Sequence, residues 1–445
     1  MNAMNIDKSA ELELLRWSEL DAASRRQLLS RPVSRQIGLQ ESVAEIIGQV
    51  RSGGDAALTE LTLRLDGNAP SQFEFTQSDL EAAADRTDRE LMQALADASS
   101  RIEAFHAADI PRNSSVETAA GLHCEVRYQA LSPVGLYIPG GSAPLVSTVL
   151  MLAIPARLAA CREIIMCSPP AANGRVPDQV LAAAHLCGVH RVFCVGGAQA
   201  VAAMAYGAGS MPRCRKIFGP GNAWVTAAKQ QVSQDPEGAA IDMPAGPSEV
   251  LVIADASANP EFIAWDLMSQ AEHGPDSQVI LLTDSKILAA AVIERLAVLA
   301  PATARAGILD QSLAEARIIL VNDLAEAIDL SNIYAPEHLI INTMNANALA
   351  QEVENAGSVF IGPWTPESLG DYCSGTNHVL PTYGWARSYG ALGVSDYLRR
   401  MTFQEASRSA LEKVGPTAEI LASVEGLEAH RMAVRTRLDH AGEEQ

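Results

Sequence analysis

Gln270 and His273 could bind a metal, because they stand three positions apart at the end of a predicted helix over residues 260–271. Residues at this spacing share one face of a helix. An amide oxygen and an imidazole nitrogen can bind the same divalent cation, and Gly274 then ends the helix. By spacing alone, however, such a pair is more often a polar pair that faces solvent at a helix end.

Glu337 and His338 are adjacent, after Pro336 and at the entrance to an apolar strand predicted over residues 339–341. An imidazole suits general acid–base chemistry because it gains and loses a proton near neutral pH. Parallel α/β sheets place ligands at strand ends, and a short shift of the strand ends would bring this pair there. The alternative is a strand-edge pair that bonds a neighbouring loop, and the residues alone leave both open.

Two further groups of possible ligands lie towards the end of the chain. Asp371 and His378 stand in a polar, glycine-rich loop after a strand predicted over residues 359–361, and loops carry function more often than their share. Glu425 and His430 stand five positions apart on a predicted terminal helix, so they do not share one face. A turn-rich connection and a solvated helix are the plain alternatives.

Two glycine turns, Gly196–Gly197 and Gly219–Gly221, each lie between an apolar strand and a helix. This arrangement can place a phosphate at the N-terminus of the helix. No G-x-G-x-x-G motif follows a strand, so the usual dinucleotide motif is missing. Tight strand–helix turns use glycine in any case, and the turns alone do not decide between a nucleotide site and a plain connection.

The elements that must position these residues alternate between strand and helix from about residue 124. This alternation predicts an α/β fold with parallel, doubly wound sheets, after a helical entry over residues 10–110 and before a helical end from about residue 396. The predicted strands cover residues 163–167, 191–195, 216–218, 250–253, 278–282, 316–321, 339–341 and 359–361, and the helices between them cover residues 179–186, 198–205, 223–232 and 260–271.

The composition of the 445 residues excludes several classes of protein. A formal net charge of −20 disfavours binding to nucleic acid or to an anionic membrane. No apolar run is long enough to span a bilayer, and the first residues do not form a signal peptide, so we expect a cytoplasmic protein. The seven cysteines show no C-x-x-C spacing, which favours reduced thiols over a four-cysteine zinc site.

Taken together, the motifs resemble the histidinol dehydrogenase family, in order and over nearly the whole chain. The matching stretches are VGLYIPGGSAPL (134–145), VGGAQA (195–200), KIFGPGNAWV (216–225), IDMPAGPSEV (241–250), DLMSQAEHGPDSQ (266–278), YAPEHLI (334–340) and GDYCSGTNHVLPT (370–382).

The resemblance implies two doubly wound parallel-sheet (incomplete Rossmann-like) domains with small helical N- and C-terminal segments. Residues 1–34 would form the N-terminal segment, and residues 35–133 together with 248–392 the α/β domain that holds the metal and the catalytic residues. Residues 134–247 would form an inserted NAD-binding α/β domain. Residues 393–445 would form an appendage that completes the site of a partner subunit in an intertwined homodimer.

The resemblance also implies the reaction and the site. The substrate would be L-histidinol, oxidised through its aldehyde to L-histidine, with zinc positioning the substrate. His338 would remove the alcohol proton as hydride passes to NAD, and Glu337 would help water add to the aldehyde. The implied ligands of zinc are Gln270, His273, Asp371 and His430; substrate contacts fall on these four and on Ser248, His338, His378 and Glu425; NAD contacts fall on Tyr137, Gln199 and Asn222.

Three other functions are weighed against this one. A relative in the same superfamily could oxidise another small alcohol, such as a sulfonated diol, with the same zinc and NAD, although His378 and Glu425 provide for an imidazole. A zinc hydrolase would use Glu337 as base, and a scaffold would catalyse nothing. Cys373, two residues from Asp371, invites a thiohemiacetal mechanism, which we discount because an acid–base pair and a hydrate need no thiol.

Overall fold

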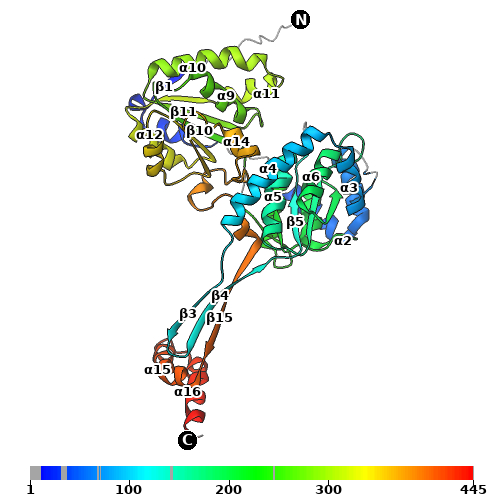
Figure 1. Ribbon diagram of the computed structural model, residues 1–445, viewed down its shortest axis with the longest axis vertical. Helices are drawn as coiled ribbons and strands as arrows, with labels where there is room; N and C mark the ends of the chain where they lie inside the picture. Colours follow the sequence, from blue (N-terminus) through cyan, green and yellow to red (C-terminus); the bar gives the residue numbers. More distant parts are fainter. Residues whose placement is uncertain are drawn as a thin grey trace.

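The computed structural model describes residues 12–31, 38–67, 70, 72–140, 144–243 and 246–443. It consists of two α/β lobes and a long arm that ends in two helices (Figure 1). Each lobe is built on a six-stranded sheet, and the arm on a three-stranded one. The two lobes are called the β10 lobe and the β5 lobe, after a central strand of each sheet.

The β10 sheet has the strand order β1-β12-β11-β10-β13-β14, and all its pairs are parallel. Its central strands are buried on both sides, as near-continuous runs of Val, Ile and Leu require. Helices α9, α10 and α11 pack on one face and α12 on the other. The strands are β1 (Leu14–Arg16), β10 (Glu249–Ala254), β11 (Gln278–Thr283), β12 (Arg317–Leu320), β13 (His338–Asn342) and β14 (Ser358–Ile361); the helices are α1 (Ala22–Leu28), α9 (Pro260–Ala271), α10 (Lys286–Leu299), α11 (Ala306–Leu313), α12 (Leu324–Tyr334), α13 (Ala346–Leu349) and α14 (Glu367–Tyr372).

The β5 sheet has the order β2-β7-β6-β5-β8-β9 and is parallel except for its edge strand β2. Helices α3 to α6 cover one face, and α2, α7 and α8 cover the other. The strands are β2 (Glu74–Phe75), β5 (Val134–Tyr137), β6 (Ile164–Ser168), β7 (Arg191–Cys194), β8 (Lys216–Phe218) and β9 (Ala240–Ile241); the helices are α2 (Leu39–Asp66), α3 (Gln77–Arg86), α4 (Arg89–Ala108), α5 (Val146–Leu158), α6 (Asp178–Cys187), α7 (Gly197–Tyr206) and α8 (Ala223–Gln234).

The arm is an antiparallel sheet of β3 (Ser114–Ala119), β4 (Leu122–Ala130) and β15 (Leu398–Ala406), in the order β15-β4-β3. In its register Leu398 faces Ala130 and Ala406 faces Leu122. Beyond it, α15 (Arg408–Val424) and α16 (Glu428–Glu443) pack together at the far end, away from both lobes (Figure 1). The arm therefore carries the end of the chain away from the lobes of its own subunit.

The α/β fold with two parallel sheets is confirmed, and the predicted strands of both lobes are present within one or two residues of their predicted bounds. The structure differs from the predicted division of the chain in two places. We expected residues 35–133 to accompany residues 248–392, but β2 pairs with β7 and helices α2 to α4 pack on the β5 lobe. The helical end from residue 396 also begins with a strand, β15.

The chain crosses between the lobes in a way that sets the two sheets end to end. It leaves the carboxyl end of β9 at Ile241 and enters the amino end of β10 at Glu249. At the start of this crossing, Asp242 accepts a hydrogen bond from the backbone N–H of Gly219, in the turn after β8 (2.7 Å). The amino ends of the β10-sheet strands therefore lie towards the carboxyl ends of the β5-sheet strands. None of the helices in the described ranges is both long and apolar enough to cross a membrane.

Candidate active site

Glu337 and His338 are brought to the amino end of β13 by a tight turn. Helix α12 ends at Tyr334, Ala335 adopts a left-handed conformation (φ +54°), and Pro336 leads into the strand. A left-handed alanine costs free energy, so the surrounding contacts must hold the turn. Both side chains are buried. The pair thus lies at the end of the parallel sheet opposite to the one where α/β sheets usually place ligands.

The backbone of Glu249, the first residue of β10, contacts both members of this pair. Its N–H donates to Glu337 Oε2 (2.8 Å), and its carbonyl oxygen lies 3.1 Å from His338 Nδ1. A carbonyl can only accept, so this contact requires a proton on Nδ1, and Nε2 is the nitrogen that faces the rest of the site.

Gln270 and His273 come from the end of α9, as the spacing predicted. Gln270 is buried, and its amide lies between Glu367 and the backbone of Glu249. With its nitrogen towards the carboxylate, the amide donates to Glu367 Oε1 and accepts from Glu249 N at 3.0 Å. His273 lies at the exposed rim, near enough for Asp371 and His338 to influence its charge.

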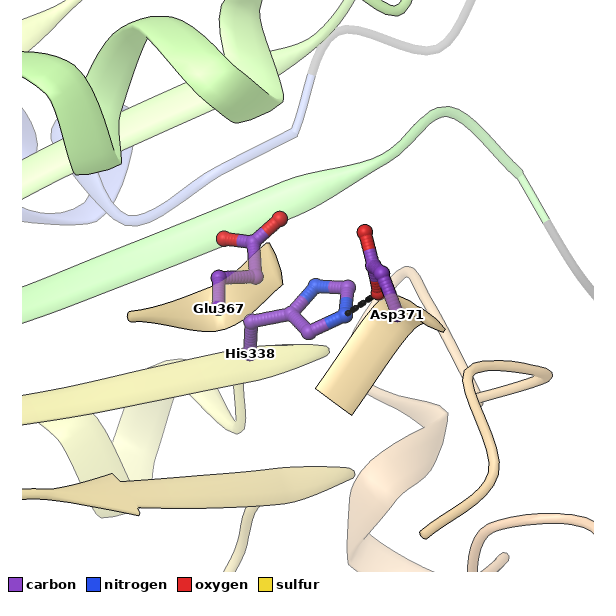
Figure 2. A group of neighbouring side chains, drawn as sticks. All are labelled: His338, Glu367 and Asp371. Atoms are coloured by element: carbon purple, nitrogen blue, oxygen red, sulfur yellow. Dashed lines mark ion pairs between the residues drawn. The ribbon is translucent and has the colours of Figure 1, made fainter. Parts of the chain in front are cut away.

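Helix α14 supplies Glu367 and Asp371, four residues apart and therefore on one face. Asp371 Oδ1 lies 3.6 Å from His338 Nε2, and the carboxyl group of Glu367 lies on the other side of the ring (Figure 2). His378, in the loop that follows, has Nδ1 2.9 Å from the backbone oxygen of Asp371. Residues from α9, β13 and α14 therefore converge on one place.

His338, Glu367 and Asp371 each offer an atom of the kind that binds metals, and these three atoms lie within 4.8 Å of one another. In the described part of the chain, His338 Nε2 and Glu367 Oε2 are buried without a hydrogen-bond partner. Buried polar atoms are almost always paired in proteins, and several buried carboxyl groups around one imidazole concentrate negative charge. A divalent cation with nitrogen and oxygen ligands fits both observations.

Burial and mutual repulsion shift the charges of the cluster. Burial raises the pKa of Glu337 to about 8, and it also raises the pKa of Glu367 well above its usual range. For His338 burial acts to lower the pKa, but Glu367, Glu337 and Asp371 together raise it to about 10. Burial acts to raise the pKa of Asp371, but the neighbouring His338 outweighs it and the pKa is lowered. The protonation states of these four buried groups therefore depend on one another.

Glu425 and His430 are not brought to this cluster within one chain. Glu425 follows α15 and His430 lies on α16, both exposed at the end of the arm (Figure 1). Of the four predicted zinc ligands, the structure brings together Gln270, His273 and Asp371 and leaves His430 apart. Ser248, the residue before β10, lies beside the cluster at the same end of the sheet.

The predicted NAD contacts lie at the carboxyl end of the β5 sheet. Tyr137 and Gln199 are buried at the N-terminus of α7, where the Tyr137 hydroxyl accepts from Gly197 N (3.0 Å) and Gln199 Nε2 donates to Asp66 (3.3 Å). Asn222 caps α8 by accepting from Trp224 N and Val225 N. All three residues therefore flank the two glycine turns, and Asn222 also has a structural task.

Sequence reasoning missed Glu367 and Glu249. Glu367 was within reach, because it precedes Asp371 by four positions, but residues 365–382 were interpreted as a loop and the spacing was not used. Glu249 gave no signal, since its contribution to the site is made by its backbone. Only the pairing of β10 with β13 brings that backbone to Glu337 and His338.

The fold and this site define a two-lobed α/β enzyme with a buried acid–base centre. A family model described as histidinol dehydrogenase matches residues 29–438. A relative from Xylella fastidiosa (strain 9a5c), named histidinol dehydrogenase, is 54% identical over 96% of this chain and 99% of its own length. One from Vibrio parahaemolyticus, with the same name, is 50% identical over 95% of this chain and 97% of its own length.

A solved structure agrees with these relatives. The crystal structure of histidinol dehydrogenase from Elizabethkingia anophelis superposes with a TM-score of 0.92 at 40% identity, and the match covers 98% of this chain and 100% of that one. The chain belongs to the histidinol dehydrogenase family and is an oxidoreductase that acts on a CH–OH group.

Proposed function

We propose that this chain oxidises L-histidinol through L-histidinaldehyde to L-histidine, the last step of histidine biosynthesis, with NAD as the oxidant. The observation that carries the proposal is the buried pair Glu337 and His338 beside Glu367 and Asp371, in a chain that matches the family over residues 29–438. The alternative substrate, a sulfonated diol, gains no support from the comparisons, because the curated relatives carry the histidinol dehydrogenase name.

His338 acts as the base in both oxidations. Its Nε2 faces the site, while the carbonyl of Glu249 holds its other nitrogen. It takes the proton of the alcohol oxygen as hydride leaves the carbon that bears this oxygen. Glu337, held by the N–H of Glu249, then receives a proton from the water that adds to the aldehyde. As the hydrate forms, His338 returns its proton to the aldehyde oxygen, and it then deprotonates the hydrate for the second oxidation, so one buried pair serves both steps.

A zinc ion fits the nitrogen and oxygen groups at this end of the β10 sheet. Gln270, His273 and Asp371 would hold it, together with His430 of a second copy of the chain. When bound, zinc supplies a positive charge that grips the polar end of the substrate and offsets the buried carboxylates. The unpaired atoms His338 Nε2 and Glu367 Oε2 support the proposal that a cation binds in this space. Ser248, His378 and the second copy's Glu425 would contact the substrate.

NAD would bind at the carboxyl end of the β5 sheet, near Tyr137, Gln199 and Asn222. The glycine turns there precede the N-termini of α7 and α8, where the helix dipole favours an anion. Because the crossing at residues 242–248 joins this end to the amino end of β10, a cofactor on one lobe faces the acid–base pair on the other.

Two copies of the chain would complete each other's sites. The arm carries His430 and Glu425 away from their own lobes and exposes apolar side chains at its end, including Val424 (82% exposed). Apolar side chains are also exposed on and beside α9 and α14, including Trp364 (79% exposed), which lies against Phe262 at the start of α9. Each apolar surface would cover the other in an intertwined homodimer. The cytoplasmic location expected from the sequence stays a prediction.

The first test is an anaerobic mixture of the protein with zinc, NAD and L-histidinol, followed by NADH absorbance and product analysis. We expect about two NADH for each L-histidine formed, because each oxidation transfers one hydride. Equal NADH formation with a sulfonated diol would favour the alternative substrate. Turnover of an ester or amide without NAD would instead favour a hydrolase.

The second test mixes two inactive variants, Glu337→Gln and His430→Ala, under conditions that exchange subunits. If the arm completes the partner's site, each mixed dimer holds one intact site, and about a quarter of the wild-type activity returns from a statistical mixture. The control mixes Glu337→Gln with Asp371→Ala, whose lesions lie in the same lobe, and should restore none. Verified mixed dimers without restored activity would contradict the exchanged arm.

A further inference from the structure

Arg31 is a buried arginine of the N-terminal segment that reaches behind the active site. Its side chain is 9% exposed, and its guanidinium group forms a two-pronged ion pair with Glu249, from Nε to Oε1 (2.5 Å) and from Nη2 to Oε2 (2.8 Å). Nη2 also donates to the carbonyl oxygens of Tyr334 (2.9 Å) and Ala335 (3.2 Å). The group lies over the Tyr334 ring, 3.8 Å from its centre.

Both sets of contacts lead directly to the acid–base pair. Glu249 is the residue whose backbone N–H holds Glu337 and whose carbonyl faces His338 Nδ1. Tyr334 and Ala335 form the turn that precedes the pair, and Ala335 is left-handed there (φ +54°). A planar guanidinium group can hold a carboxylate and two carbonyls at once in a fixed geometry. Arg31 thus fixes the two backbone segments between which Glu337 and His338 are set.

We propose that Arg31 is a positioning residue, which holds Glu249 and the Tyr334–Ala335 turn so that Glu337 and His338 keep their reactive geometry. The proposal rests on the proposed function, in which these two residues exchange the protons. Arg31 touches neither of them, so its effect passes through the backbone. Without Arg31, the carboxylate of Glu249, whose residue is 1% exposed, would be a buried charge without its cation, which is unfavourable. The chain must then move at the base of the site, where small displacements cost about 100-fold in rate.

A neighbouring arginine provides a matched control. Arg317, on β12, donates from Nη1 to the carbonyl of Leu28 and from Nη2 to that of Ser30 (3.0 Å). Arg317 therefore holds the same N-terminal segment, but it binds the backbone of that segment just before Arg31 and makes no use of Glu249. Loss of Arg317 should weaken the docking of the segment and leave the acid–base pair in place.

The experiment compares Arg31→Met, Arg31→Lys and Arg317→Met in the zinc-loaded, full-length protein. For Arg31→Met we expect kcat to fall about 100-fold, with the KM for NAD and the zinc content unchanged. Arg31→Lys keeps the charge but not the two-pronged geometry, and should lose about tenfold. Arg317→Met should keep kcat within about threefold of the wild type, because it loses only hydrogen bonds to the backbone of the N-terminal segment.

Rescue separates positioning from a general loss of structure. Millimolar guanidinium ion should raise kcat of Arg31→Ala several-fold and leave Arg317→Ala unchanged, because only the first opens a cavity facing Glu249. Full kcat in folded Arg31→Met, an equal loss in Arg317→Met, or rescue of both variants would overturn the proposal. If Arg31→Met does not fold, Arg31→Lys and the guanidinium measurement decide in the same way.

The two proposals can fail separately. If the wild type oxidises no histidinol, the proposed function fails, and crystal structures still test the role of Arg31. In that case Glu337 Oε2 should leave the N–H of Glu249 in Arg31→Met but not in Arg317→Met. An unmoved Glu337 in the first variant would overturn the positioning role whatever the reaction is.

Discussion

The two lobes share one architecture but present opposite ends and different chemistry to each other. At the amino end of the β10 sheet, the groups that matter are buried ionisable side chains, with Glu337, Glu367 and Asp371 around His338. At the carboxyl end of the β5 sheet, they are the glycine turns and the N-termini of α7 and α8. In the proposed function, one end supplies the side chains that move protons, and the other supplies helix N-termini that would receive an anion.

The difference teaches why both lobes are needed. Hydride transfer requires a proton acceptor and a cofactor on two sides of one carbon, and a single sheet end would have to hold both. Joining an amino end to a carboxyl end by the crossing at residues 242–248 divides these tasks between two frameworks. It also predicts that variants at the two ends will change different quantities.

The largest effect is expected for Asp371→Ala at the β10-sheet end. This variant removes a proposed metal ligand and the carboxylate that lies 3.6 Å from His338 Nε2. We expect the zinc content to fall from about one per subunit towards zero and kcat to fall about 1,000-fold or more, while NAD binding, measured by fluorescence titration, changes less than about twofold. Asp310→Ala, an exposed carboxylate of the same lobe, is the control. Full zinc content in Asp371→Ala would remove this residue from the ligand set.

The second largest effect is on the free energy of unfolding, which a buried carboxyl group of the β10 lobe should lower. Burial raises the pKa of Asp266, on α9, from 3.8 to about 7. A carboxyl group that is harder to ionise in the folded protein lowers stability as the pH rises from about 4 to 7, because the unfolded chain loses its proton first. Asp266→Asn should therefore stabilise the protein, by an amount that grows by up to about 3 kcal/mol between pH 5 and pH 8.

Urea unfolding at the two pH values measures this change in the free energy of unfolding. Asp255→Asn, at the other end of β10, is the control and should show no comparable change between pH 5 and pH 8. Hydrogen bonds from Ser257 and Met344 outweigh burial there and lower the pKa of Asp255, so its contribution stabilises above the unfolded pKa and disappears as the pH falls. A stability difference for Asp266→Asn that does not depend on pH would show that Asp266 ionises normally.

Much of the fold could be predicted from the sequence, because local pattern and burial agree in the two sheets. Strand β8 and helix α9 have the predicted bounds, since apolar runs, a capping Asn259 and Gly274 mark their ends. The arm could not be predicted. Strand β15 is exposed over most of its length, so it shows no alternation of apolar and polar residues. Its partner β4 also lies far away in the sequence.

The candidate site was predictable in its residue types but not in its geometry. The spacing of Gln270 and His273 on α9 placed them correctly at the helix end, whereas no local pattern reports on which sheet the helices α2 to α4 pack. The end of the sheet at which the pair lies could not be predicted from local sequence either. A strand that starts at His338 looks the same in sequence whichever way its neighbours run, and only the parallel pairing with β10 shows that Glu337 and His338 lie at the amino end of the whole sheet.

The smallest effect tests whether Asn222 serves only as a helix cap. Its side chain accepts from Trp224 N (3.0 Å) and Val225 N (3.1 Å) at the start of α8. Asn222→Ala should lower the free energy of unfolding by about 1 kcal/mol and raise the KM for NAD. Asn222→Asp keeps the cap, so the stability should return while the KM for NAD stays raised, because the new negative charge would face the cofactor phosphates.

The matched control for Asn222 lies on the other lobe. Asn259 caps α9 in the same way, by accepting from Glu261 N (2.9 Å). Asn259→Ala should therefore lose a similar amount of stability, about 1 kcal/mol, without any change in the KM for NAD. If Asn222→Asp restores both stability and KM, or if the two alanine variants raise the KM equally, Asn222 is a cap alone. The division of tasks between the two sheet ends would then rest on the backbone of the glycine turns, with no help from this side chain.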